Sequence, residues 1–315
     1  MAALLMLKEK IKVIYADYHK VIVPVVKAVV AFVMLLAIND KIGYMSKLDS
    51  LLVMIALSAI CAFTPRTVTV LVGLTAVLAH LSALSIEVAL VAVAVFLVMT
   101  LIYLRFCSKD ILLVVLTPLS FYFGVPYIMP LVAGILCGPA AALTLGCGIV
   151  VHYYIDYISV NALTIQGMSA SATVEKIRIG LDGIIGNDAM FLALLSFVAA
   201  TLVVHILRRQ AIDHAWSVAI FSGAMTNVIL NFMGILVFDN GPSVIGLLLG
   251  TVIAVPLALL VAVLFMGLDY SRTERVQFED EDYYYYVKAV PKMKIQVPAK
   301  TVKRINTQKY RTHHK

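Results

Sequence analysis

The polar residues that could act on a solute lie inside long apolar stretches of the sequence. Asn227 and Asn231 are four residues apart in SGAMTNVILNFMG, and Thr226 lies beside the first of them. If this stretch is a helix, the two amides share one face, which should point into the protein because unpaired amides in hydrocarbon are costly. The face either lines a path for a small solute or holds two helices together by hydrogen bonds. The sequence leaves both interpretations open.

A second set of candidates lies in residues 125–157, VPYIMPLVAGILCGPAAALTLGCGIVVHYYIDY. Gly134 and Gly138 are four residues apart, a spacing that lets two helices approach closely, so we expect Gly138→Leu to disrupt folding. His152 and Asp156 are also at helical spacing. Helix breakers in a bilayer require neighbouring helices or a water-lined cavity to satisfy the backbone. The stretch predicts either a broken, solute-lining core or a tightly packed helical hairpin.

Composition sets the class of protein. Of 315 residues, 62% are hydrophobic and only 14% are charged, whereas soluble domains have about 25% charged residues. Runs such as Ile86–Val98 are almost solidly apolar and do not alternate as barrel strands do. The sequence therefore predicts an all-α, multi-pass bundle in the cell membrane, with the lipid bilayer as its surroundings.

The sequence carries no motif for a common enzyme or cofactor site. It contains no phosphate-binding glycine loop, no HExxH and no GxSxG. The four cysteines are not in CxxC pairs and are interpreted as packing residues; they are Cys61, Cys107, Cys137 and Cys147. We predict no catalysis, no metal and no cofactor.

The chain divides into an amphipathic N-terminal helix over residues 1–20, a membrane domain over 21–268 and a soluble tail over 269–315. The expected bundle has about eight to ten apolar segments, which are Val21–Ile38, Leu51–Thr64, Thr67–Leu81, Ile86–Leu104, Ile111–Phe123, 125–138, 139–157, Met190–Leu207, Ala219–Phe238 and Val244–Leu268. Some are short or re-entrant, because fourteen residues reach only about 21 Å of the roughly 30 Å hydrocarbon core.

The first twenty residues carry an apolar stripe at helical spacing, formed by Leu4, Leu7, Ile11, Ile14 and Tyr18. Lysines lie around the stripe. Such a helix can rest on an anionic leaflet. It can equally be an extension of the first span.

Lysine and arginine near the span ends favour a cytoplasmic location for both chain ends. The exceptions to this bias are Lys41, Lys47, Lys176 and Arg178. Residues 158–188 are then the longest polar loop, on the outside, and Val174–Leu181 within it predicts a short surface helix.

A faint internal repeat appears at an offset of 61 residues. Pro65 matches Pro126, and Gly73 matches Gly134. With three segments in each unit, the two copies would have inverted topology, a common plan in transporters. The pattern thus allows a 3+3 inverted repeat.

The tail differs chemically from the rest of the chain. Residues 269–315 contain 11 Lys and Arg against 6 Asp and Glu, a balance of +5 out of +7 for the chain. This segment has too few aliphatic residues for a core and is predicted to be a disordered cytoplasmic tail. Its basic end suits anionic headgroups or a cytoplasmic protein rather than nucleic acid. Four consecutive tyrosines could add as a strand to a partner's sheet; they are Tyr283, Tyr284, Tyr285 and Tyr286.

The residues Gly134, Gly138 and Pro139, with Gly146 beyond them, lie in VAGILCGPAAALTLGCG. This segment resembles the GxxxGP-type helix junction in substrate-binding subunits of energy-coupling-factor vitamin transporters. It is also similar to the related junction in rod-shape membrane proteins of the bacterial envelope. The whole chain looks like bacterial inner-membrane proteins described as transporter permeases. The resemblance covers 17 residues and transfers no substrate-binding residue.

Two functions follow from these patterns. The first is a transporter, or a transporter subunit, for a small solute. The residues named above would line the path of this solute. The alternative is a membrane scaffold in cell-envelope assembly whose tail recruits a partner. Copies of the same chain or a transporter complex are the expected assemblies.

Overall fold

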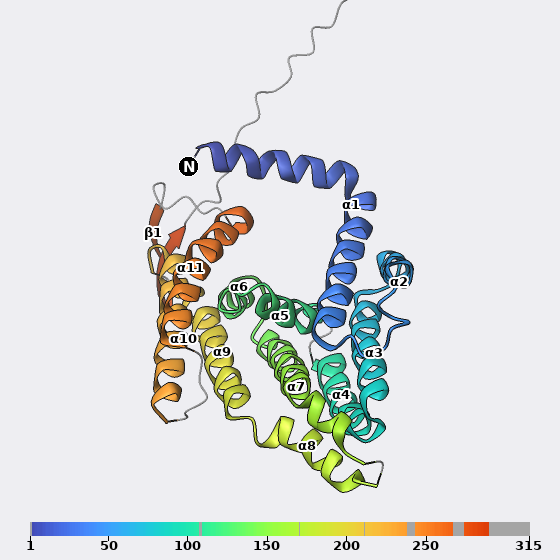
Figure 1. Cartoon of the computed structure of the whole chain (residues 1–315). Helices are drawn as coiled ribbons and strands as arrows, with labels where there is room; N and C mark the ends of the chain where they lie inside the picture. Colours follow the sequence, from blue (N-terminus) through green and yellow to red (C-terminus); the bar gives the residue numbers. More distant parts are fainter. Residues whose placement is uncertain are drawn as a thin grey trace, which may run out of the picture.

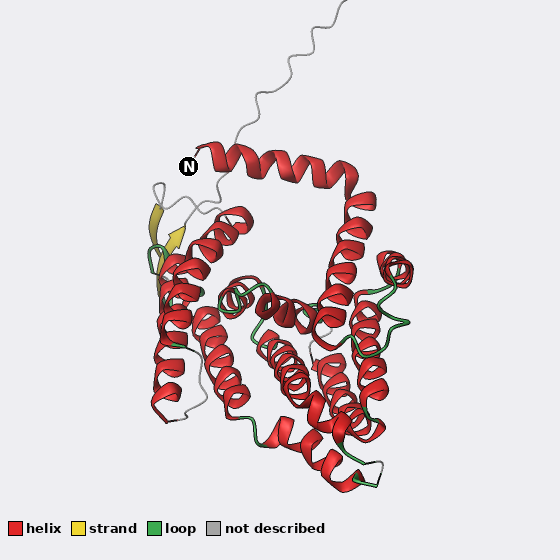
Figure 2. Cartoon of the chain, viewed as in Figure 1, coloured by secondary structure: helices red, strands yellow, loops and turns green. Residues whose placement is uncertain are grey.

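The computed structural model describes residues 2–106, 109–169, 171–210, 212–237, 243–266 and 274–289. In these ranges the chain forms eleven helices and one two-stranded hairpin (Figures 1 and 2). The elements are α1 Ala2–Ile42, α2 Leu51–Phe63, α3 Arg66–Leu84, α4 Ile86–Phe106, α5 Leu113–Tyr122, α6 Ile128–Leu136, α7 Ala141–Gly167, α8 Thr173–Ile185, α9 Asp188–Leu207, α10 Ala215–Val237, α11 Val244–Met266, β1 Glu274–Glu279 and β2 Tyr284–Ala289.

Six helical stretches among the described residues are long and apolar enough to cross a membrane. They are Val13–Ile42, Arg66–Leu84, Ala141–Gly167, Thr173–Leu207, Ala215–Val237 and Val244–Phe265. Shorter apolar helices, α2 and α5 among them, complete the bundle. The predicted class, a multi-pass helical membrane protein with some short segments, is confirmed.

Helix α1 bends at Tyr18, where the backbone leaves helical geometry with φ −115° and ψ 16°. The arm before the bend lies across one end of the bundle (Figure 1). The Lys8 Nζ donates to the carbonyl of Val263, 3.3 Å away near the end of α11. The start of α1 and the end of α11 therefore lie at the same end of the molecule. The arm's contact with a lipid leaflet stays a prediction.

Helix α7 lies between two packed cores. One core joins α7 to α1, α3, α4 and α5, and it buries Tyr154 completely. The other joins α7 to α6, α9, α10 and α11, and it buries Leu145 and Ile149. Different helices thus cover the two faces of α7, which places the middle of this helix, with His152 and Asp156, between the two cores.

Helices α5 and α6 are too short to span a bilayer, with 10 and 9 residues against about 20 for a full span. The predicted break before Pro139 is confirmed, because α6 ends at Leu136 and α7 begins at Ala141. The Arg208 Nη2 donates to the Cys137 carbonyl at 2.8 Å. A side chain from the end of α9 therefore satisfies a backbone group that the break exposes.

The two glycines of the junction differ in their surroundings. A Cβ at Gly134 would lie 2.6 Å from the Cβ of Val204 and 2.9 Å from the carbonyl oxygen of Thr201, so α6 and α9 are in close contact there. A Cβ at Gly138 would meet nothing within 4 Å. The expectation that Gly138 marks a close helix approach is wrong, because this residue lies beyond the end of α6.

The predicted outer loop over residues 158–188 is largely helical. Helix α7 continues to Gly167, and α8 follows from Thr173 to Ile185. The surface helix expected at Val174–Leu181 is therefore present, but the first ten residues of the loop extend α7. His152 and Asp156 consequently lie in the middle of α7 and not at the end of a span.

Two pairs of helices begin at nearly the offset of the faint repeat, which is 61 residues. Helix α5 begins 62 residues after α2, and α6 begins 62 residues after α3. The lengths differ, because α3 has 19 residues and α6 has 9. An inverted relation between the two units stays a prediction.

Candidate functional site

The main candidate site is a cavity between α1, α3, α5 and α7. Its walls are mostly aliphatic, with Val115 among the lining residues, and its polar lining includes Lys41, His152 and Asp156. The volume open to the centres of water molecules is about 70 Å³, whereas one water needs roughly 10–15 Å³. The cavity therefore has room for several waters or for a small aliphatic group.

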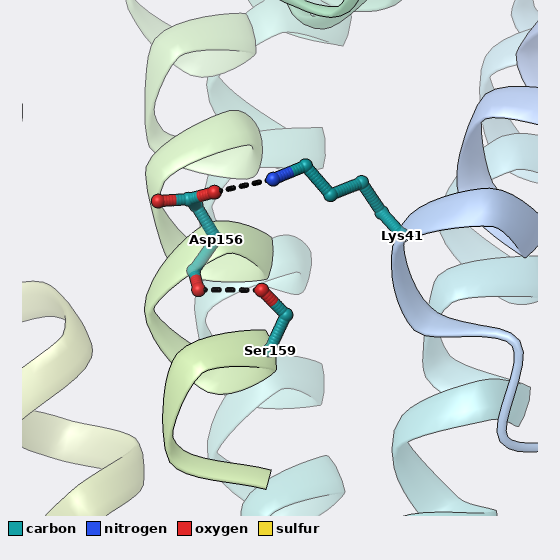
Figure 3. A network of polar contacts seen from close by, with 3 residues as sticks. All are labelled: Lys41, Asp156 and Ser159. Carbon is teal, nitrogen blue, oxygen red and sulfur yellow. Dashed lines mark hydrogen bonds and ion pairs between the residues drawn. The ribbon is translucent and has the colours of Figure 1, made fainter.

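An ion pair lies at the polar part of this cavity (Figure 3). The Lys41 Nζ is 2.7 Å from the Asp156 Oδ1, and each side chain is 43% exposed. Lys41 is in the last turn of α1, and its partner is 115 positions away in α7. The Ser159 hydroxyl donates to the backbone carbonyl of Asp156 and therefore does not compete with Lys41 for the carboxylate. Because charges in membrane spans are costly, such a pair marks a candidate functional site.

An aromatic stack holds the imidazole of His152. Its ring lies against Phe121, with centroids 4.1 Å apart and planes 15° from parallel. Phe121 in turn stacks on Phe197 at 5.8 Å. The stack joins α7, α5 and α9, so the plane of the imidazole at the cavity wall is set by three helices.

A buried polar network supports the end of α1 that carries Lys41. The Met45 backbone N–H donates to Nδ1 of His80 at 3.1 Å, so the proton of this ring is on Nε2, which donates to the Asn39 Oδ1 at 2.8 Å. The Asn39 amide also donates to the Leu48 carbonyl. These bonds tie the loop after α1 to α3 and thereby help to position Lys41.

The amide pair predicted on α10 is buried. Asn227 and Asn231 are 1% and 3% exposed, in agreement with the expected inward orientation. The Asn231 Nδ2 donates to the Oδ1 of Asn227 at 2.9 Å and to its backbone carbonyl at 2.8 Å. The Thr226 hydroxyl donates to the Ser222 carbonyl one turn before. The pair therefore satisfies part of its own hydrogen bonding within α10.

Of the seven residues predicted to line a solute site, two lie on the cavity and five lie elsewhere. His152 and Asp156 are lining residues. The residues outside the cavity are Gly134, Gly138, Thr226, Asn227 and Asn231. Lys41 was missed by sequence reasoning. Its signal was its position as a basic exception to the charge bias, at the end of the first span.

The described part of the tail forms a second candidate site. Strands β1 and β2 pair antiparallel, with Phe278 opposite Tyr285 and their rings 4.9 Å apart. Asp280 at the turn accepts from the Tyr285 hydroxyl at 2.8 Å and from the backbone N–H groups of Asp282 and Tyr283. The Tyr285 hydroxyl and these N–H groups lower the pKa of Asp280.

This hairpin differs from the predicted disordered tail. Cross-strand aromatic stacking and the turn of Asp280 give residues 274–289 a local structure that their low aliphatic content did not suggest. The four tyrosines are exposed; they are Tyr283, Tyr284, Tyr285 and Tyr286. The rest of the predicted tail, residues 269–273 and 290–315, lies outside the described residues.

Comparisons with known proteins do not assign a family. No family model matches the chain, and neither the curated proteins nor the solved structures contain a match. The local resemblance at Gly134, Gly138 and Pro139 therefore gains no support from a wider match. Within the described ranges, no group of three or more His, Cys, Asp or Glu side chains could hold a metal ion. The fold defines the protein as a helical, multi-pass membrane protein.

Proposed function

We propose that this protein is a transporter, or a transporter subunit, that binds a small solute in the cavity between α1, α3, α5 and α7. The observation that carries the proposal is the Lys41–Asp156 ion pair at a mostly aliphatic cavity. Ligand sites are typically apolar cavities with a few placed polar groups. Ionisable residues in spans that face a cavity are typical of solute pathways.

The cavity wall contains an adaptable part. Gly73 of α3 packs against the Met34 side chain of α1, and both residues line the cavity. Methionine is unbranched and fills irregular gaps, so its movement can change the space available to a ligand. The wall can therefore adjust to a solute without a shift of the α1 backbone.

We expect both chain ends to be cytoplasmic, which places Lys41 and the polar part of the cavity toward the outside. The charge bias and the shared end of α1 and α11 support this orientation. Reporter fusions after Lys20 and after Asp269 should both give a cytoplasmic signal. An external signal from either fusion would contradict the proposed orientation.

A cysteine introduced at a lining position should react with a membrane-impermeant thiol reagent. Val115→Cys is on the cavity, and Ala224→Cys in α10 is its matched control, because the native residues are 6% and 5% exposed. Mass spectrometry of the modified peptides distinguishes these sites from the native cysteines. For a transporter, position 115 is labelled both in intact cells and in inside-out vesicles, while position 224 stays protected.

The labelling pattern also separates transport from other roles. Labelling of position 115 from one side only would mean a closed-ended pocket and would contradict transport. Protection from both sides would mean that the cavity is sealed, which contradicts the proposed site itself.

The alternative function, a scaffold that recruits a partner through its tail, is favoured by the exposed hairpin. A two-stranded hairpin alone is only marginally stable in water, and its tyrosines offer aromatic surface to a partner. On this hypothesis, deletion of residues 274–315 removes the function and position 115 is protected from both sides. On the transport hypothesis, the same deletion leaves the labelling of position 115 unchanged.

A further inference from the structure

The two charges at the cavity restrict which solute can bind. Lys41 and Asp156 pair with each other at 2.7 Å, and both are 43% exposed. Pairs this exposed contribute little to stability, so opening one is inexpensive. A ligand with a single charge would satisfy one of the two groups and leave the other without its partner. A ligand with both charges can replace the pair completely.

The remainder of the cavity selects for a short aliphatic body. Its walls include Val70, Leu74, Val77 and Val114. The volume of about 70 Å³ is well below the roughly 150 Å³ of an engineered cavity that holds benzene. A branched or linear aliphatic chain of a few carbons therefore suits the space better than an aromatic ring does.

We infer that the ligand is a zwitterion with an aliphatic body, whose ammonium group pairs with Asp156 and whose anionic group pairs with Lys41. This inference rests on the proposed solute site. Two sources supply this chemistry. One is a free aliphatic amino acid, and the other is a single-chain lipid with an ethanolamine phosphate headgroup, of whose chain only a few carbons would lie in the cavity.

Thermal unfolding of the purified full-length protein in a neutral detergent tests the inference. L-leucine is the first probe, and its single-charge relatives are 4-methylpentanoate, which lacks the amine, and 3-methylbutylamine, which lacks the carboxylate. Lysophosphatidylethanolamine and lysophosphatidylglycerol form the corresponding lipid pair, because the second has the same singly charged phosphodiester but no amine. We expect a zwitterion to raise the unfolding temperature, with single-charge relatives binding about tenfold more weakly or worse.

Substitutions of Asp156 and Lys41 test which charged group of the ligand pairs with each residue. Asp156→Asn removes the partner of the ammonium, so the preference should move from the zwitterion toward the anionic relative. Lys41→Gln removes the partner of the anionic group, so the ligand preference should move toward the relative that carries only the amine. Asp182→Asn is the matched control, because it breaks the exposed Arg178–Asp182 pair on α8, and neither of these residues lines the cavity. This control should leave the ligand preference unchanged.

Each outcome decides between the alternatives. Stabilisation by leucine, or by the ethanolamine lipid alone, supports the zwitterion and identifies its source. Equal stabilisation by a single-charge relative, no stabilisation by either zwitterion, or preferences unaltered in Asp156→Asn and Lys41→Gln would overturn the inference. Labelling of position 115 from both sides combined with such a result would leave transport standing and reject the zwitterion alone. Zwitterion binding combined with labelling of position 115 from one side only would support the zwitterion and reject transport.

Discussion

Replacing Gly134 by leucine should prevent stable assembly of the bundle, whereas Gly138→Leu should give folded protein. The first change places a side chain where α6 meets Val204 and the Thr201 carbonyl of α9. A backbone oxygen cannot move aside as a side-chain end can, so the helices must separate. The second change points into open space. Yield and monodispersity of the two variants in detergent measure the difference.

Smaller changes at these positions give a graded version of the test. A new methyl in a packed core costs about 1–3 kcal/mol, so Gly134→Ala should lower the unfolding temperature, and Gly138→Ala should alter the stability by less than about 0.5 kcal/mol. Shortening the opposing residue in Gly134→Ala/Val204→Ala should recover part of the loss. Unchanged stability of Gly134→Ala would show that α6 and α9 are not in close contact.

The contrast between these glycines shows how far spacing predicts structure. Two small residues four apart define a helix face only while the helix continues. Helix α6 ends at Leu136, so Gly138 never shares that face. The break itself was predictable from Gly138 and Pro139, but the α9 contact of Gly134 was not, because spacing within one helix does not identify the helix against which it packs.

The candidate site was predictable in the same partial way. Asp156 and His152 stood out as ionisable residues in an apolar stretch, but Lys41 is 115 positions away from its partner. The length of α7 was also underestimated. Ser159 and Asn161 look like loop residues, yet their side chains donate to carbonyls within the same helix, those of Asp156 and Tyr157. Polar residues whose side chains bond to carbonyls one turn before can lie in the interior of a helix.

Asn231→Leu should lower the stability of the protein and leave the cavity unchanged. The substitution removes both hydrogen bonds that the Asn231 amide donates to Asn227. It also leaves the Oδ1 of Asn227 without that donor in a site where Asn227 is only 1% exposed. Side-chain hydrogen bonds between residues in membrane helices contribute about 0.6–2 kcal/mol, and leaving a buried acceptor unpaired adds about 1–3 kcal/mol. The unfolding temperature should fall accordingly.

A double-mutant cycle separates the pair from its surroundings. Asn227→Leu/Asn231→Leu removes both partners, so it should cost less than the sum of the single changes. Met225→Leu, at an exposed position of the same helix, is the control and should leave the stability unchanged. In every folded variant, labelling of Val115→Cys should continue from both sides, because neither asparagine lines the cavity. If Asn231→Leu keeps its stability but loses this labelling, the amide pair belongs to the solute pathway and is not a structural contact.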